Sequence, residues 1–120
     1  MVVSTLSTKQ TDLVFHALSD ATRRDIVQRT MRQSQSVSTL ANLYDMSFAA
    51  VQKHVAVLER AELVSKRRAG RERLVRGNAV MLNAAARLLD AYEAIWEERA
   101  TAIENILAED GTKDRKGPLQ

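Results

Sequence analysis

A chain of 120 residues with one proline, four glycines and an apolar fraction of 45% is expected to form one mostly helical domain. Because it has no cysteine, the sequence excludes a disulfide framework, a thiolate metal site and a cysteine nucleophile. The net charge is only +3, but basic residues are concentrated between positions 66 and 76. Such a cluster favours a polyanion such as nucleic acid, although a solvated charged loop would look the same in isolation.

The N-terminal part of the sequence predicts a loose end followed by two helices. Residues 1–6 are expected to be flexible, and Ser7 suits the N-cap of a helix that runs to about Leu18. The Ser19-Asp20 pair then offers the cap of a second helix, over residues 21–31. In both helices the apolar residues recur at helical spacing, which predicts that one side of each packs into a core.

The next segment predicts two helices separated by a tight turn. After a polar break at residues 33–36, the spacing of apolar residues predicts a short helix over about 37–43. The turn is expected at residues 44–46, and Ser47 suits the cap of a longer helix that ends near Ala61. This succession is typical of a helix-turn-helix.

A short β-hairpin is expected after these helices. Residues 63–68 and 72–76 have strand-like character and flank a turn near Gly70. This hairpin is the only sheet that the pattern predicts. The fold is therefore expected to be mainly α-helical with a small β-hairpin wing.

From Asn78 onward the pattern predicts one helix of about thirty residues, roughly 45 Å long. Its apolar stripe is longer than one small domain can cover, so a partner chain is the expected cover. Packing of the stripe on the chain's own helices is the alternative. The polar segment 110–120 is expected to be a disordered tail, which leaves residues 7–109 as the folded domain. The expected dimer contacts are Leu88, Tyr92, Ile95, Trp96, Arg99 and Ile103.

The helix that begins after Ser47 is the expected DNA-reading element. Its apolar residues fall within one narrow arc, so its opposite side is expected to face solvent. On that side Lys53 and Arg60 can reach phosphates or guanine acceptors, and small alanines allow close approach to base edges. His54 is interpreted as a structural or phosphate-contacting residue, and Phe48 as a core residue, with contact to a thymine methyl as the alternative. The expected DNA contacts on this helix are Ser47, Ala49, Ala50, Gln52, Lys53, His54, Ala56 and Arg60.

The arginine-rich hairpin strengthens this interpretation. An amphipathic helix with a solvated basic face would explain residues 47–61 taken alone. The order of a short helix, a tight turn, a capped basic helix and a basic hairpin favours DNA binding, because a hairpin beside a recognition helix can reach phosphates or the minor groove. The expected contacts on the wing are Lys66, Arg67, Arg68, Arg71 and Arg73.

Three segments resemble the ArsR family of bacterial regulators. Residues 17–26 (ALSDATRRDI) are similar to the family's opening "ALSDPTRR.IL" segment, and residues 46–58 (MSFAAVQKHVAVL) resemble its recognition helix. Residues 63–74 resemble the wing that follows. The resemblance covers about residues 12–105 and implies a winged helix-turn-helix that dimerises through its terminal helices and represses transcription until a signal relieves it.

The sequence departs from the family pattern at two corners and at the metal sites. Ala21 replaces the usual proline, and Glu62 stands where the family has glycine, a strained choice if that position needs a positive φ. The best known members sense metals through cysteines on the third helix or through Asp and His ligands on the terminal helices. The only histidines of this chain are His16 and His54, and it has no cysteine, so no metal and no cofactor are expected. The chain resembles a cysteine-free subgroup of the family.

The sequence therefore predicts a cytoplasmic, homodimeric repressor that binds double-stranded DNA at an imperfect palindrome, with half-sites roughly 10 bp apart or a multiple of that spacing. An enzyme is not expected, because no Gly-rich phosphate loop or nucleophile–base arrangement stands out. No segment is long and apolar enough for a membrane. A winged-helix protein-interaction module and a non-specific architectural DNA binder are the alternatives. The sequence leaves open whether a small-molecule inducer exists.

Overall fold

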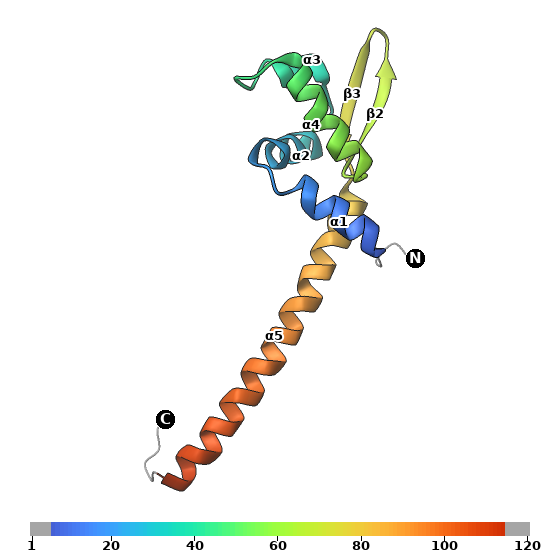
Figure 1. The fold of residues 1–120 in the computed structure, drawn as a ribbon. Helices are drawn as coiled ribbons and strands as arrows, with labels where there is room; N and C mark the ends of the chain where they lie inside the picture. Colours follow the sequence, from blue (N-terminus) through green and yellow to red (C-terminus); the bar gives the residue numbers. More distant parts are fainter. Residues whose placement is uncertain (1–5, 115–120) are drawn as a thin grey trace. The chain divides into compact units, whose positions relative to one another are not determined.

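The computed structural model describes residues 6–114, which divide into two compact units after Ala86. The first unit holds a helical core with a small sheet, and the second is the rest of the C-terminal helix. In chain order the elements are α1 (Thr8–Ala17), α2 (Ala21–Arg32), β1 (Gln35–Ser36), α3 (Val37–Ala41), α4 (Phe48–Arg60), β2 (Val64–Ala69), β3 (Glu72–Gly77) and α5 (Ala79–Asp114) (Figure 1).

Side-chain caps fix where the helices begin. Ser7 forms a full capping box with Gln10, in which the Ser7 hydroxyl accepts from the Gln10 N–H at 3.0 Å and the Gln10 side chain accepts from the Ser7 N–H at 3.2 Å. Asp20 caps α2, and Ser47 caps α4 by accepting from the Ala50 N–H at 3.1 Å. These three predicted caps are confirmed, and each contributes about 1 kcal/mol to its helix.

The core of the first unit is built from aliphatic side chains. The α4 residues Val51, Val55 and Leu58 are fully buried, as their narrow arc predicted. They pack with buried residues of the neighbouring helices and strands, which include Val14, Ile26, Leu40, Leu63 and Val75. Because this stripe is buried, the orientation of α4 is fixed and its opposite side is left for solvent.

The sheet has a third strand that the sequence analysis did not predict. The strand order is β1-β3-β2, all antiparallel, and β1 pairs Gln35 with Val75 and Ser36 with Leu74 of β3. In the sequence these residues belong to the polar break at 33–36. A strand of two residues is too short to show alternation, and it is held by backbone pairing with β3, so its sequence carries no pattern. The wing is therefore a hairpin extended by one short strand.

The corner between α4 and the wing needs a left-handed residue. Glu62 has φ 61°. The Leu63 N–H donates to the Leu58 carbonyl at 3.0 Å, and the Glu62 N–H donates to the Glu59 carbonyl at 2.9 Å. These two bonds form a Schellman motif, in which glycine is the usual residue at the Glu62 position. Glu62 therefore has the positive φ at which a residue other than glycine is strained.

The C-terminal helix is longer than predicted. Asn78 caps α5 by accepting from the Val80 and Met81 N–H groups at 3.1 and 3.3 Å. The helix continues to Asp114, whereas a disordered tail was expected from residue 110. One glycine weakens a helix by only about 1 kcal/mol and does not stop it, so Gly111 was a poor end marker. The predictions of a flexible N-terminus and a disordered tail fall in part on residues 1–5 and 115–120, which lie outside the described residues.

Candidate nucleic-acid interface

The side of α4 that faces away from the core carries the predicted reading residues. Ser47, Ala49, Gln52, Lys53 and Arg60 are exposed, and Ala50 and Ala56 are half-buried. The cap at Ser47 leaves the first N–H groups of the helix beside this face, where a phosphate would meet the positive end of the helix dipole. In Figure 1, α4 lies beside the β2–β3 hairpin. The helix therefore offers a polar surface next to the wing.

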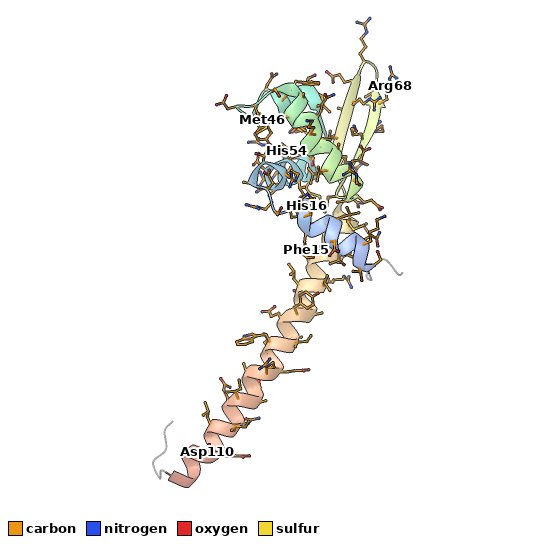
Figure 2. All side chains as sticks on the ribbon, in the orientation of Figure 1. Phe15, His16, Met46, His54, Arg68 and Asp110 are labelled. Carbon is orange, nitrogen blue, oxygen red and sulfur yellow. The ribbon has the colours of Figure 1, made fainter. Side chains whose placement is uncertain are left out.

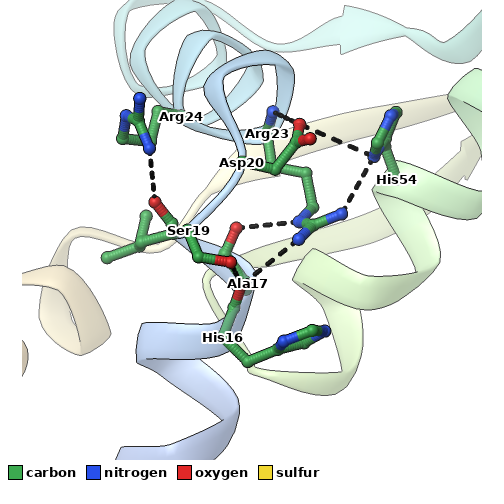
Figure 3. Close-up of polar contacts among 8 residues, drawn as sticks. His16, Ala17, Ser19, Asp20, Arg23, Arg24 and His54 are labelled. Atoms are coloured by element: carbon green, nitrogen blue, oxygen red, sulfur yellow. Dashed lines mark hydrogen bonds and ion pairs between the residues drawn. The ribbon is translucent and has the colours of Figure 1, made fainter.

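His54 lies on the same helix but points to α2. Its Nδ1 is 3.1 Å from Arg23 Nη1 and 3.9 Å from Asp20 Oδ2, and its side chain is only 21% exposed (Figure 3). Of its two predicted roles, the geometry corresponds to the structural one. For Phe48 the favoured prediction was core packing, but the residue is 47% exposed. The first turn of α4 thus presents an aromatic ring to solvent.

The corner between α1 and α2 explains why His54 turns inward. Arg23 donates through Nε to the Ala17 carbonyl at 2.8 Å and through Nη2 to the His16 carbonyl at 3.2 Å. Arg24 donates to the Leu18 carbonyl at 2.8 Å (Figure 3). The two arginines therefore add side-chain donors to carbonyls at the end of α1, of which the His16 carbonyl also accepts from the Ser19 N–H at 3.1 Å. Through the Arg23–His54 contact, the same corner also holds α4.

The carboxylate of this corner is stabilised in its charged form. Asp20 accepts from the Arg23 N–H at 3.0 Å, and this backbone hydrogen bond holds the pKa of Asp20 below its ordinary value. A negative charge at the start of α2 also suits the helix dipole. The ALSDATRR segment, which resembles the family pattern, thus contains the Asp20 cap of α2 and the two arginines that bind the end of α1. One of these arginines, Arg23, also contacts α4.

A second polar cluster, which the sequence analysis missed, fixes the turn before α4. The Tyr44 hydroxyl donates to Asp25 Oδ2 at 2.5 Å, and Arg29 Nε donates to the same oxygen at 2.7 Å. These hydrogen bonds lower the pKa of Asp25, while burial together with the bond to Asp25 raises the pKa of Tyr44 to about 12. Tyr44 and Asp25 are 19 positions apart, so no local pattern could have paired them.

The predicted wing arginines are exposed along the hairpin. Arg67 and Arg68 lie on β2, Arg73 lies on β3 opposite Arg68, and Arg71 lies in the turn beside Gly70, which has φ 64°. Figure 2 shows Arg68 at the outer part of the hairpin. These positions give the wing a dense positive surface.

Lys66 differs from the wing arginines because it is half-buried. Its Nζ lies 3.5 Å from Glu59 Oε1 on α4, so it joins the wing to the helix. A cation that is already paired is a weaker phosphate ligand than an unpaired one. Lys66 therefore has a contact with α4, while its contact with DNA stays a prediction.

A hollow of about 440 Å³ lies between α4 and the wing. Phe48 and Gln52 line it from the helix, and Arg71, Glu72 and Arg73 line it from the hairpin. Ser38 of α3 lies at its wall as well, a position that the sequence analysis did not select. The hollow joins the exposed face of α4 to the basic wing, so one ligand can contact both.

The second unit exposes a row of large apolar side chains on α5. Tyr92, Ile95 and Trp96 are exposed by 56%, 56% and 64%, and Ile103 by 47%. Arg99 is exposed as well, whereas Leu88, the first predicted contact, is half-buried. Leu89, Ile106 and Leu107 belong to the exposed set too, although they were not predicted. This amount of exposed apolar surface on one helix is typical of an interface.

Two classes of site have no counterpart in the part of the chain that the structure describes. Between residues 6 and 114 there is no group of three or more His, Cys, Asp or Glu residues that could hold a metal ion. Over the same residues, no helix has a stretch with the length and apolar character needed to cross a bilayer.

The chain is similar to known regulators in both sequence and structure. Residues 18–67 match a family described as a helix-turn-helix domain. The HTH-type transcriptional regulator Rv2034 of Mycobacterium tuberculosis is 33% identical over 100 residues, which cover 83% of this chain and 91% of the relative.

Among solved structures, an ArsR-like transcriptional regulator from Rhodococcus sp. RHA1 matches with a TM-score of 0.73 and 38% identity, over 82% of this chain and 92% of that chain. The homodimeric winged helix-turn-helix DNA-binding domain of Mb0332 from Mycobacterium bovis has a TM-score of 0.57 at 22% identity, over 75% and 81% of the two chains. The second likeness bears on the fold alone.

Proposed function

The chain belongs to the ArsR family of winged helix-turn-helix transcriptional regulators, which bind DNA and are not enzymes, and from this premise we propose that it is a dimeric repressor of an imperfectly palindromic operator. The observation that carries this proposal is the combination of an exposed polar face on α4, fixed by a buried stripe behind it, with an arginine-rich wing beside it. As a protein that acts on DNA, it would work in the cytoplasm.

The two parts of the surface have different tasks in this proposal. Gln52 and Lys53 on α4 read base edges in the major groove, because amide and ammonium groups discriminate between bases there. The wing residues Arg67, Arg68, Arg71 and Arg73 bind phosphates, which contributes affinity without sequence preference. Phe48 at the edge of the hollow adds an apolar contact of the kind that a thymine methyl accepts.

The exposed apolar row on α5 supports a dimer. A second copy of the same row would cover Tyr92, Ile95, Trp96 and Ile103, with the two aromatic residues as the expected anchors. The homodimeric state of the Mb0332 domain, which shares the fold, is compatible with this arrangement. A two-fold dimer presents two α4 helices to DNA, so the operator half-sites should be roughly 10 bp apart or a multiple of that spacing. A dimer bound there would repress by excluding polymerase.

Selection of bound DNA from a random pool tests the proposal. We expect recovery of a site with two related half-sites, and a complex of two chains per site by analytical ultracentrifugation. Recovery of DNA with no preferred sequence would instead indicate an architectural binder. Failure to retain random DNA at low salt, where phosphate contacts are strongest, would indicate a protein-interaction module and would reject DNA binding.

A further inference from the structure

An apolar pocket of about 360 Å³, separate from the DNA-facing hollow, is lined by residues of α2, the end of α1 and the start of α5. We call it the α2 pocket. Its walls are Leu18 at the end of α1, Val27 and Met31 of α2, and Leu82 in the first turn of α5. Almost all of the surface inside it is apolar. The pocket therefore joins three helices of the first unit around an apolar interior.

The volume of the pocket sets the size of the ligand that could fill it. An enclosed apolar cavity of about 150 Å³ is enough to bind benzene. The α2 pocket is open to solvent on one side, so it has room for an apolar body of on the order of ten carbon atoms that is covered on its other sides. Its volume also lies within the usual range of small-molecule sites, roughly 300 to 1,000 Å³. The apolar walls favour a hydrocarbon or aromatic body over a sugar or a nucleotide.

The rim of the pocket carries the charge that such a ligand would have to match. Arg24 and Arg32 lie one on each side of Gln28 along α2, and all three residues are exposed. None of the described residues that line the pocket is acidic. Two guanidinium groups above an apolar interior are complementary to a molecule with an apolar body and one carboxylate, since arginine binds carboxylates through paired N–H donors.

The pocket is also connected to the reading helix. Arg24 at its rim donates to the Leu18 carbonyl, and Leu18 forms one of its walls. The preceding residue, Arg23, ties the end of α1 to His54 of α4. A carboxylate that draws Arg24 Nη1 away from the Leu18 carbonyl would loosen the end of α1, which the neighbouring Arg23 connects to His54 of α4.

From these four observations we propose that the α2 pocket binds a small organic carboxylate with an apolar body of about ten carbons, and that the bound ligand weakens DNA binding. The first half of this proposal concerns binding alone. The second half rests on the proposed function and makes the pocket the site through which the repressor is relieved.

The binding half is tested with 2-naphthoate as the probe and uncharged 2-naphthol as its match. The chain has four methionines, and Met31 lines the pocket whereas Met46 lies in the turn before α4. Carbon-13 labelling of the methionine methyl groups therefore gives a local reporter and an internal control. We expect 2-naphthoate to shift the Met31 resonance to saturation, with little change at Met46 and weaker binding of 2-naphthol.

Three variants separate the pocket from general surface binding. Arg32→Gln should weaken 2-naphthoate binding about five- to tenfold, because one charge-assisted contact is lost at an exposed rim. Arg29→Gln on the same helix is the matched control, since Arg29 contacts Asp25 and does not line the pocket. Gln28→Trp should fill the pocket and abolish the Met31 shift, while Gln28→Ala should retain it.

Several results would overturn the binding half. These are an unchanged Met31 resonance, equal binding of 2-naphthol, and equal effects of Arg32→Gln and Arg29→Gln. A Met31 resonance that shifts on simple dilution of the protein would also overturn it, because a second copy of the chain would then occupy the pocket.

The regulatory half is tested by titrating selected operator DNA with and without 2-naphthoate. We expect DNA affinity to fall about fivefold or more in the wild type and to stay unchanged in Gln28→Trp. If the ligand binds but affinity does not change, the regulatory half is wrong and the site remains. If the wild type binds no DNA at all, the proposed function fails together with the regulatory half, while the Met31 titration still decides the pocket.

Discussion

The helices α4 and α5 are both amphipathic, but their apolar sides have different surroundings. On α4 the apolar stripe is fully buried within the first unit. The turn before α4 is fixed by the hydrogen bond from the Tyr44 hydroxyl to Asp25, and its side is held by the hydrogen bond from Arg23 to His54. On α5 beyond Ala86, the large apolar side chains are about half-exposed. The comparison teaches that contacts within one chain position α4, whereas within one chain the large apolar side chains of α5 beyond Ala86 stay exposed.

The largest effect is expected where a charge is placed on the exposed row of α5. Trp96→Glu should dissociate the dimer, because a central aromatic anchor of an interface contributes about 2–4 kcal/mol, or roughly a 30- to 1,000-fold change in dimer affinity. Sedimentation equilibrium measures this change. Glu97→Gln, on the neighbouring position, is the control and should leave the dimer intact. A variant Trp96→Glu that remains dimeric would reject this row as the interface.

Two substitutions on the DNA-facing side should separate base reading from phosphate binding. Lys53→Ala should weaken operator binding by about 1–3 kcal/mol and change the preferred bases. Arg71→Ala should weaken binding to all sequences alike and reduce the slope of affinity against salt by about one. Salt-titrated gel shifts on operator and random DNA measure both. If neither substitution changes affinity, the assigned interface is wrong.

Removal of the Tyr44 hydroxyl should loosen the turn before α4. Tyr44→Phe leaves the Asp25 carboxylate with Arg29 alone, and we expect a loss of about 1 kcal/mol in the free energy of unfolding. Urea unfolding at neutral pH measures the loss. Tyr92→Phe is the matched control, since Tyr92 is exposed on α5 and should be neutral in the same assay. Equal stabilities for wild type and Tyr44→Phe would show that the hydrogen bond does not support the turn.

The same cluster predicts how stability depends on pH. The pKa of Asp25 is lowered in the folded state, so its contribution is present above the ordinary carboxylate pKa, about 4, and is lost as pH falls below it. The pKa of Tyr44 is raised to about 12, so its contribution is lost as pH rises from its ordinary value of 10.0 toward that value. Both losses should be smaller in Tyr44→Phe, as followed by urea unfolding across pH. A variant with the same pH profile as the wild type would contradict this assignment.

The smallest effect is expected at the end of α4. Glu62→Gly should stabilise the first unit by up to about 1 kcal/mol, because glycine adopts the left-handed conformation at little steric cost. Thermal unfolding measures the gain. Glu62→Ala keeps the strain and is the control, so a stabilisation of equal size in both variants would show that charge, and not backbone conformation, decides the effect.

Much of the molecule could be predicted from local patterns. The caps at Ser7, Asp20 and Ser47, the buried arc of α4 and the hairpin around Gly70 all follow from interactions between residues a few positions apart. Such interactions leave a record in the sequence, because each requires a particular residue type at a fixed spacing. The family resemblance marked Glu62 as a strained choice if its position needs a positive φ, and its φ is 61°.

The tertiary structure alone decided the contacts between distant segments. The strand β1, the Tyr44–Asp25 bond, the Arg23–His54 contact and the exposure of Phe48 depend on which segments pack side by side. A hydrogen bond between residues 19 or 31 positions apart imposes no spacing on the sequence. Thus the sequence by itself determined the helices, the hairpin and the side of α4 that faces outward, and only packing decided which polar side chains hold that helix in place.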